Sequence, residues 1–308
     1  MTDTRKEILL ALATEAQTGP ALAEQLDISR AAVWKHIEAL REQGFTIDSA
    51  PSGYTLAGTP EFGGLVVEYQ LDAPFTVVYE DSVTSTNNRA RELAAEGKEQ
   101  MVVLADEQTT GKGRLDRGWS SPSGGIWMSI LLRPDLPPVH TPRLTLAAAV
   151  AVTEAARERG VDAGIKWPND VLVGDSEEKL SGILTEMEGE ADRVSWVAIG
   201  IGINANIGAE DLPEGATSLQ EQIGTVDRAA FTRDVLDRFY ELYQHPDQIT
   251  ARWREYAVTL DRPVRIQQPG TEVTGRAVDI EENGALLIET EDETISVSAG
   301  DCEHLRQQ

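Results

Sequence analysis

Apolar residues near the N-terminus recur at helical spacing and predict a small helical unit that ends in a hairpin. A first helix is predicted within residues 4–15, and a short apolar face at 21–26 leads into a tight turn. Ser29 is a good N-cap for the next helix, over residues 30–42. Two short strands then flank the turn at 51–53. Two helices, a tight turn and a β-hairpin are typical of a winged helix-turn-helix.

The rest of the chain mixes strand-like and helix-like stretches before it becomes all strand. Strands are predicted over 76–80, 101–106, 126–133 and 194–203, and helices over 86–96, 144–159, 231–243 and 249–257. Because their alternation lacks regular βαβ spacing, we expect a mixed α/β layer structure. After residue 260, apolar residues of period two alternate with turn signals, which predicts a small five-strand β-barrel.

The predicted fold class is therefore α+β, with three domains. Residues 1–60 form a winged helix-turn-helix of the DNA-binding type, 61–260 a central mixed α/β domain, and 261–308 a C-terminal small β-barrel. A chain of 308 residues exceeds the usual size of one domain, which agrees with this division.

The charge balance is strongly acidic, with 27 Lys+Arg against 52 Asp+Glu and a formal net charge of −25. Such a balance usually argues against a nucleic-acid partner. The acidic residues are dispersed over the chain, however, as in proteins adapted to molar salt, where screening shortens the Debye length to about 3 Å. We favour the salt-adapted interpretation, so the net charge does not exclude DNA binding.

Two further observations limit the classes of protein. The sequence has no run of about 18 apolar residues and no basic-then-apolar leader, so we expect no membrane partner and a cytoplasmic location. Cys302 is the only cysteine, which excludes an internal disulfide and a four-cysteine zinc site. The four histidines are scattered and have no neighbours at ligand spacing, so a protein-bound zinc is not expected.

Residues 109–119 read TTGKGRLDRGW and gather Lys112, Arg114 and Arg117 between glycines. Glycines let backbone N–H groups approach anionic oxygens, and arginine offers a forked donor to phosphate or carboxylate. The pattern favours a cradle for a phosphate-bearing ligand. It is neither a Walker motif nor a dinucleotide GxGxxG motif. The alternative interpretation is a solvated surface turn.

Residues 164–184 read GIKWPNDVLVGDSEEKLSGIL and present Asn169 and Asp170 at a strand end. Lys179 follows across a short acidic hairpin. A carboxylate, an amide and a lysine brought together could bind Mg²⁺, ribose and an anionic substrate. Taken singly, Asp170 is more often a turn cap and Lys179 a surface charge.

Two more stretches are candidates to line a ligand site. In AIGIGINANI, residues 198–207, alternate glycines allow close backbone approach and Asn204 lies at the strand end. This stretch is either a ligand floor or a buried strand followed by a turn. Ser85, Thr86 and Asn87 stand at a helix start, where hydroxyls, amides and exposed N–H groups can hydrogen-bond a polar heterocycle or simply cap the helix.

Together these stretches closely resemble the bifunctional biotin protein ligases, which attach biotin to a lysine of a carrier protein and, in some members, repress transcription. The resemblance covers essentially the whole chain. Its most specific pieces are the STN triplet, the Gln-x-x-Gly-Lys/Arg-Gly-Arg loop ending in tryptophan, KWPND, KLSGIL and GIGINAN. It implies a biotin–[acetyl-CoA-carboxylase] ligase in which residues 61–260 form the biotin- and ATP-binding catalytic domain.

The resemblance also implies a reaction and partners. Biotin's carboxylate attacks the α-phosphate of ATP to give biotinyl-5′-AMP and pyrophosphate, and a lysine of a biotin carboxyl carrier protein then attacks the mixed anhydride and releases AMP. ATP with Mg²⁺ and biotin are substrates, and no tightly bound prosthetic group is expected. In the family the adenylate promotes homodimerisation and binding to operator DNA.

The family's functional residues carry over to matching positions of this chain. By this resemblance biotin is contacted by Ser85, Thr86, Asn87, Gln108, Lys112, Gly113, Arg114 and Lys179. The nucleotide is contacted by Lys112, Arg114, Trp119, Asn169, Lys179, Gly182 and Asn204. The catalytic residues are Lys179, Arg114 and Asp170, and Asp170 is also the candidate ligand of Mg²⁺.

The predicted helix over 30–42 carries the candidate contacts to DNA. Phosphate or base-edge contacts are expected from Ser29, Arg30, Lys35 and His36. Arg41 is a further candidate on the same helix, and Trp34 is expected to pack partly against its own domain.

The chain departs from the family pattern in its loop, and two alternatives stay open. Lys112 stands where most members carry arginine and lacks the planar fork for bidentate contacts, while Leu115 and Asp116 replace more polar or glycine residues. A lipoate ligase of the same broad fold shares adenylation and a lysine acceptor, although the KWPND and STN pieces resemble biotin enzymes. A non-catalytic biotin-sensing regulator is the other alternative, and retention of the catalytic residues argues against it.

Overall fold

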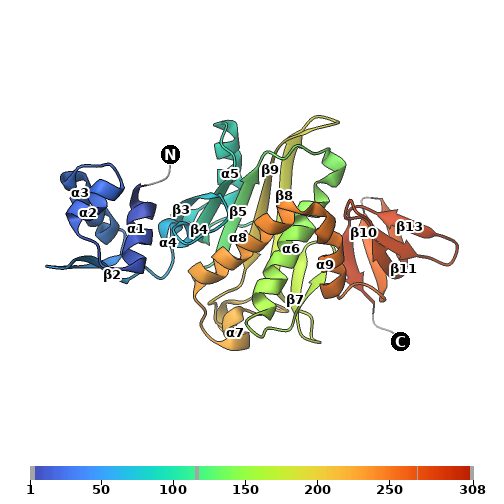
Figure 1. The fold of residues 1–308 in the computed structure, drawn as a ribbon. Helices are drawn as coiled ribbons and strands as arrows, with labels where there is room; N and C mark the ends of the chain where they lie inside the picture. Colours follow the sequence, from blue (N-terminus) through green and yellow to red (C-terminus); the bar gives the residue numbers. More distant parts are fainter. Residues whose placement is uncertain (1–3, 115–117, 269, 306–308) are drawn as a thin grey trace.

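The computed structural model describes residues 4–114, 118–268 and 270–305, so Leu115 and Asp116 lie outside the described residues. The chain is arranged as three regions in sequence order (Figure 1). The N-terminal helices lie at one end, a large sheet covered by helices in the middle, and a small sheet at the other end. Within the described ranges, no helix is both long and apolar enough to span a bilayer.

The N-terminal region is a winged helix-turn-helix, as predicted. Its elements are α1 (Thr4–Thr14), α2 (Gly19–Gln25), α3 (Arg30–Glu42), β1 (Thr46–Ala50) and β2 (Gly53–Gly58). Thr18 and Ser29 cap α2 and α3 by accepting hydrogen bonds from Ala21 N at 3.3 Å and Ala32 N at 3.1 Å. Asp27 adopts a positive φ of 52° in the tight turn between these two helices. The caps and the turn set the direction in which α3 leaves α2.

The central region is a mixed sheet of seven strands in the described part of the chain. Their order is β3-β4-β5-β9-β8-β7-β6; β3 and β4 run parallel, and the other neighbours run antiparallel. The strands are β3 (Thr76–Val83), β4 (Met101–Gln108), β5 (Ile126–Leu132), β6 (Ala163–Lys166), β7 (Asp170–Val173), β8 (Glu178–Gly189) and β9 (Val194–Ile203). Asn169 and Asp170 thus lie at a strand end, as predicted, and Asp170 is the first residue of β7.

Helices cover both faces of this sheet. They are α4 (Gly64–Glu68), α5 (Thr86–Ala95), α6 (Pro142–Arg157), α7 (Leu219–Ile223), α8 (Arg228–Gln244) and α9 (Ile249–Tyr256). On β4, Val102 and Leu104 belong to the main core, which also contains the buried face of α6, whereas Val103 clusters with Ala90 and Leu93 of α5. Because successive strand residues point to opposite faces, α5 and α6 lie on opposite sides of the sheet.

The C-terminal region contains the five predicted strands as an open sheet. They are β10 (Pro263–Gln268), β11 (Thr271–Ile280), β12 (Leu286–Glu289), β13 (Thr294–Val297) and β14 (Asp301–His304), in the order β13-β12-β11-β10-β14. Among the described residues, β13 and β14 pair with one neighbour each, and a barrel closes only when such edges pair with each other. The sheet docks on the central region through Trp167, whose Nε1 donates to Gly284 O at 3.0 Å.

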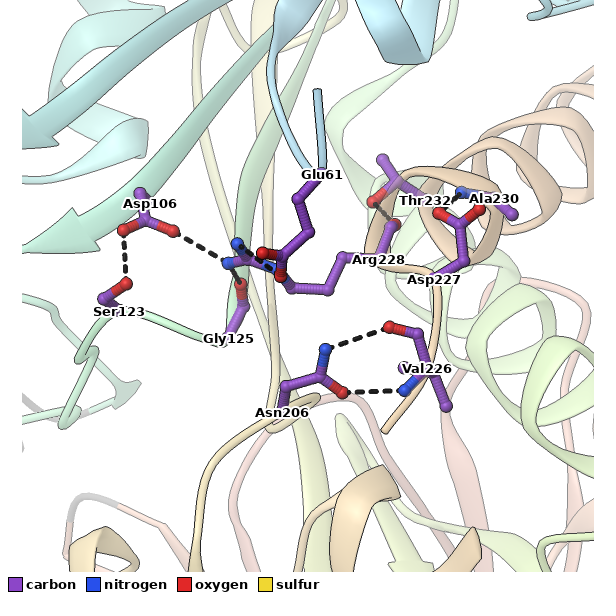
Figure 2. Close-up of polar contacts among 10 residues, drawn as sticks. All are labelled: Glu61, Asp106, Ser123, Gly125, Asn206, Val226, Asp227, Arg228, Ala230 and Thr232. Carbon is purple, nitrogen blue, oxygen red and sulfur yellow. Dashed lines mark hydrogen bonds and ion pairs between the residues drawn. The ribbon is translucent and has the colours of Figure 1, made fainter. Parts of the chain in front are cut away.

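A buried arginine joins three segments of the central region (Figure 2). Arg228, in the first turn of α8, donates to Asp106 Oδ1 at 2.7 Å and to Gly125 O at 3.2 Å. Its guanidinium also lies 4.2 Å from the ring centroid of Phe62 and 3.6 Å from a carboxylate oxygen of Glu61. The cluster links the end of β4, the start of β5 and the segment that leads in from the winged helix.

Asp106 is the acidic centre of this cluster. Burial raises its pKa, but hydrogen bonds from Ser123 and Arg228 outweigh burial and hold the pKa of Asp106 below its usual value. Ser123 donates to Oδ2 while Arg228 binds Oδ1, so both carboxylate oxygens are engaged (Figure 2). Since β4 ends at Gln108 and β5 begins at Ile126, the cluster anchors both ends of the glycine-rich loop.

We expect Arg228→Met to lower the free energy of unfolding by about 3 kcal/mol, because Asp106 would keep its charge in a mostly buried position without its partner. This corresponds to roughly 6–12 °C in the midpoint of thermal unfolding, measured by scanning calorimetry. The matched control is Arg193→Met, since Arg193 is 73% exposed and lies 3.8 Å from Asp135. The control should lose less than about 1 kcal/mol. Equal shifts in the two variants would contradict the role of Arg228.

Candidate active site

A cavity of about 100 Å³ lies where the glycine-rich loop, α5, β8 and β9 meet. All the residues predicted to bind biotin or nucleotide line it, except Asn204: Ser85, Thr86, Asn87, Gln108, Lys112, Gly113, Arg114, Trp119, Asn169, Lys179 and Gly182. Asp170 lines it too, with Met128, Ile183, Leu184, Gly200, Ile201, Gly202 and Asp301. Motifs far apart in the sequence therefore meet in one site.

The start of α5 forms a polar wall of the cavity, made by Ser85, Thr86 and Asn87. Thr86 N and Oγ1 both donate to Gln108 Oε1, at 2.9 and 3.1 Å. Asn87 Oδ1 accepts from Ser129 Oγ at 2.6 Å, and Asn87 Nδ2 donates to the carbonyl of Leu184 at 3.2 Å. Because both ends of the Asn87 amide are held, its orientation is fixed before any ligand arrives.

Ser85 differs from its two neighbours in this wall. It occupies the N-cap position of α5, yet its side chain makes no capping hydrogen bond, and the residue is only 4% exposed. Buried hydroxyls are usually hydrogen-bonded. Simple helix capping, the alternative interpretation of this serine, therefore does not describe its hydroxyl, which faces the cavity instead.

Lys179 and Asp170 form an ion pair in the cavity. Lys179 Nζ lies 2.7 Å from Asp170 Oδ1, and the two side chains are 32% and 23% exposed. Nζ also lies 4.9 Å from the centroid of the Trp119 ring, in a cation–π contact. An ammonium group has three donors, so this lysine can hold its carboxylate and still donate to an anionic ligand.

Arg114 ties the glycine-rich loop to two other parts of the site. Its Nη1 donates to Asn169 Oδ1 at 3.1 Å, and its Nη2 donates to Gly300 O at 2.9 Å. Asn169 Nδ2 in turn donates to Ile183 O at 2.9 Å. The C-terminal sheet therefore reaches the cavity through the Gly300 carbonyl and the neighbouring Asp301 side chain.

Glycines of β8 and β9 let side chains approach the backbone closely. A methyl group at position 182 would lie 3.0 Å from the Trp119 ring, and one at position 202 would lie 2.8 Å from Trp119 Nε1. A methyl group at position 200 would lie 2.6 Å from Asn87 Oδ1. The floor of the cavity is thus backbone, and larger residues at Gly200 or Gly202 would displace its lining.

Two residues predicted to contact the nucleotide have other surroundings than expected. Asn204 is buried outside the cavity lining, where its Nδ2 donates to Lys179 O at 3.3 Å and Thr217 O at 3.0 Å. It therefore supports the backbone of Lys179. Lys112 lines the cavity but is exposed, and its backbone pairs with Gly118 across the loop.

The sequence prediction did not name Met128 or Asp301, but it did give the alternate glycines of residues 198–207 as a possible ligand floor, and Gly200 and Gly202 line the cavity. The two glycines stand in the GIGIN stretch, so their spacing did carry a signal. Met128 and Asp301 carry none, because each reaches the cavity from a strand whose neighbours are defined only by the fold.

The candidate DNA contacts lie at the surface of the N-terminal region. Ser29, Arg30 and Lys35 are exposed and His36 is half-buried. Ser29 also caps α3, so its oxygen is engaged with Ala32 N.

Predictions were also made for two other residues of α3. Arg41 donates to Ile47 O and to Ser49 Oγ at 2.8 Å, so it joins the helix to the wing. Trp34 is 56% exposed, which agrees with the prediction that it packs only partly against its own domain. The buried face of α3 runs through Val33 and Ile37, and Trp34 stands about 100° around the helix from Val33.

Fold and site together define a ligase that activates an acid, joined to a domain of the DNA-binding type. A profile of the biotin/lipoate A/B protein ligase family matches residues 77–204. Profiles of the biotin protein ligase C-terminal domain and of a helix-turn-helix domain match residues 259–305 and 4–55.

Individual relatives extend these matches over the whole chain. The bifunctional ligase/repressor BirA of Bacillus subtilis is 37% identical over 315 residues, which covers 96% of each chain. The Escherichia coli protein of the same description is 31% identical and covers 92% of this chain. The biotin protein ligase from Aquifex aeolicus in complex with biotin and ATP has a TM-score of 0.63 at 28% identity, over 75% of this chain and 99% of that one. The chain belongs to the biotin protein ligase family, with the domains of its bifunctional ligase/repressor type.

Proposed function

We propose that the chain activates biotin with ATP and then transfers it to a lysine of a biotin carboxyl carrier protein. In the first step a biotin carboxylate oxygen bonds to the α-phosphorus while the bond to pyrophosphate breaks. In the second step the lysine nitrogen bonds to the acyl carbon, AMP leaves and the nitrogen loses a proton. The observation that carries the proposal is one cavity lined by both the polar wall and the cations Lys179 and Arg114.

Lys179 and Arg114 would lower the electrostatic barrier of the first step. A carboxylate and a triphosphate repel each other, and further charge develops on the leaving pyrophosphate. Lys179 and Arg114 stand in a partly buried site, where fixed charges stabilise a transition state more strongly than in water. Arg114 is already oriented by Asn169 and Gly300 O, so little reorganisation is needed when the phosphate arrives.

Biotin fits the polar wall better than lipoate does. The biotin head carries a ureido group with two N–H donors and one carbonyl acceptor, whereas the dithiolane of lipoate has no strong hydrogen-bonding group. Ser85 has a hydroxyl without a capping bond, and Asn87 and Thr86 are fixed in orientation. A site built to hydrogen-bond its substrate discriminates strongly against an analogue that lacks the polar group.

Mg²⁺ fits this site as part of the nucleotide substrate. No group of three or more His, Cys, Asp or Glu side chains suited to a metal occurs in residues 4–114, 118–268 and 270–305. Mg²⁺ commonly keeps several waters and binds one or two protein carboxylates together with substrate phosphates. Asp170 would be such a carboxylate, and the ion would supply charge neutralisation for the phosphates.

The N-terminal region gives the protein its second role, as a repressor that binds operator DNA. The support is the winged helix-turn-helix with exposed Arg30 and Lys35 at the start of α3. Homodimerisation on adenylate binding belongs to the same proposal and is measured by sedimentation with and without biotin plus ATP. Because the reaction consumes ATP, we place it in the cytoplasm.

The direct test is mass spectrometry of the purified protein incubated with biotin, ATP and Mg²⁺. We expect bound biotinyl-5′-AMP, and no corresponding adduct when lipoate replaces biotin. If no biotinyl-5′-AMP forms under any condition, the ligase assignment is refuted. If an adduct forms with lipoate alone, the substrate is lipoate and not biotin.

Lys179→Ala should lower the rate of adenylate formation by about 100–1,000-fold, because its contribution grows with transition-state charge. The Kd for biotin should change by less than about tenfold, since biotin binding draws on the polar wall as well. The rate is measured by single-turnover pyrophosphate release and the Kd by calorimetry. The control is Lys98→Ala, at an exposed site. Equal losses in rate and biotin binding would overturn the role of Lys179.

Gly200→Ala should raise the KM for biotin by about tenfold, because the added methyl group would stand 2.6 Å from Asn87 Oδ1 and push the amide out of place. The KM for ATP should stay near its parent value. Gly58→Ala, in the wing, is the matched control, since its methyl group meets only ordinary contacts at 3.5 Å. A variant whose biotin KM is unchanged would show that Asn87 does not orient the vitamin.

Lys35→Gln should weaken DNA binding about equally on all sequences and reduce the slope of log affinity against log salt by about one, as loss of one phosphate contact does. Electrophoretic mobility shift on duplexes selected from a random pool measures both. Lys98→Gln, exposed in the central region, is the control and should change neither value. If the salt dependence of Lys35→Gln is unchanged, Lys35 of α3 does not contact DNA phosphate.

A further inference from the structure

A hydrogen-bond chain through His304 connects the C-terminal sheet to the two segments that carry the catalytic ion pair. His304 lies on β14 with a side chain only 7% exposed. Its Nδ1 is 3.0 and 3.1 Å from the two carboxylate oxygens of Glu177, and its Nε2 is 3.0 Å from Thr259 Oγ1. Thr259 Oγ1 accepts from Trp167 N at 2.9 Å. We call these four residues the His304 relay.

The proton positions in the His304 relay follow from the donors and acceptors available. Thr259 Oγ1 accepts from Trp167 N, so its own proton is free to go to His304 Nε2, which must then carry a lone pair. Nδ1 carries the ring proton and donates it to Glu177. A neutral His304 with its proton on Nδ1 therefore satisfies all four groups.

The surroundings of His304 favour this neutral form. Burial lowers its pKa below the ordinary value of 6.5, and the lowering prevails over the opposing effect of Glu177. Lys166 and Arg262 also lower it. Asp175 lines the same shallow surface pocket beside the ring.

Both ends of the His304 relay lead directly to catalytic residues. Glu177 closes the turn between β7 and β8 with a positive φ of 55°, two positions before Lys179. Trp167 stands three positions before Asp170, in the segment between β6 and β7. The relay therefore holds the strand segments from which the two members of the 2.7 Å ion pair project.

We propose that His304 is a positioning residue for adenylate formation: the C-terminal strand sets the geometry of Lys179 and Asp170 through the hydrogen bonds of His304 to Glu177 and Thr259. This inference rests on the proposed ligase function. The relay is distinct from the Arg114–Gly300 contact, because its hydrogen bonds involve neither residue and none of its four members is among the residues that line the cavity. Its effect therefore falls on the chemical step and not on biotin binding.

The first test removes the hydroxyl of the relay while leaving the ring in place. Thr259→Val should lower kcat of biotin-dependent pyrophosphate release by roughly 10–100-fold, the cost of a displacement near 1 Å. The KM for biotin should stay within about twofold, because α5 is untouched. Thr259→Ser keeps the hydroxyl and should restore most of the activity. A Thr259→Val variant with parent kcat, or one whose kcat and biotin binding fall together, would overturn the proposal.

The second test uses pH. In the parent, protonation of His304 Nε2 blocks its acceptance from Thr259, so kcat should fall as pH drops through the folded pKa of His304, which lies below 6.5. His304→Phe retains a ring without hydrogen bonds; it should have a low kcat that lacks this acid limb. An acid limb that is the same in both proteins would contradict the relay. If the parent itself forms no biotinyl-5′-AMP, the ligase assignment fails. If the parent is active and Thr259→Val and His304→Phe are equally active, only the proposal for the His304 relay is refuted.

Folding provides an independent readout of the same groups. Because the folded pKa of His304 lies below the unfolded value, its neutral form contributes stability that is complete above about pH 6.5 and is lost as pH falls through the folded pKa. The thermal midpoint of the parent should decline over that window, and the decline should be smaller in His304→Phe. Equal declines in the two proteins would show that His304 is not buried in the neutral form.

Discussion

Lys179 Nζ lies 2.7 Å from Asp170 Oδ1 because of a single irregularity in the pairing of β7 with β8. Asp170 pairs with Gly182 and Val171 with Ser181, but Leu172 then pairs with Lys179. In a regular ladder Leu180 would take that position, and the lysine would point to the opposite face of the sheet. The bulge thus places a cation on the same face as its carboxylate, and the reactive end of the cavity depends on it.

Other parts of the chain hold this arrangement from outside the central sheet. The C-terminal sheet contributes the Gly300 carbonyl that orients Arg114, and its last strand contributes His304. The segment that leads in from the winged helix contributes Glu61 and Phe62, which contact Arg228 and so the anchor of the glycine-rich loop. Regions outside the central sheet therefore contact, directly or through one further residue, the side chains that line the cavity.

This dependence explains how far the sequence could predict the site. Short motifs such as STN and KWPND can be recognised in the sequence, so Ser85, Asn87 and Asn169 were found by pattern and do line the cavity, whereas Asn204 of the GIGINAN motif lies outside the lining. Asp301 belongs to no such motif, and its place depends on how β14 docks beside β10.

The same limit applied to the secondary structure and to individual residues. The five C-terminal strands follow a period of two that can be seen in the sequence itself, whereas an open or closed sheet depends on whether distant edges meet. Arg41 shows the same limit for a single residue: it was a candidate contact to DNA, and its hydrogen bonds to Ile47 O and Ser49 Oγ of the wing depend on how the fold brings the wing to α3.

Trp119 forms one boundary of the cavity. Sites for small molecules usually measure about 300–1,000 Å³, and this cavity holds about 100 Å³, with the indole close against the backbone of Gly182 and Gly202. Its Nε1 is buried without a hydrogen-bond partner among the described residues. An unpaired buried donor costs about 1–3 kcal/mol. The indole ring therefore bounds the cavity on the side of Gly182 and Gly202, with one donor that the described residues leave unsatisfied.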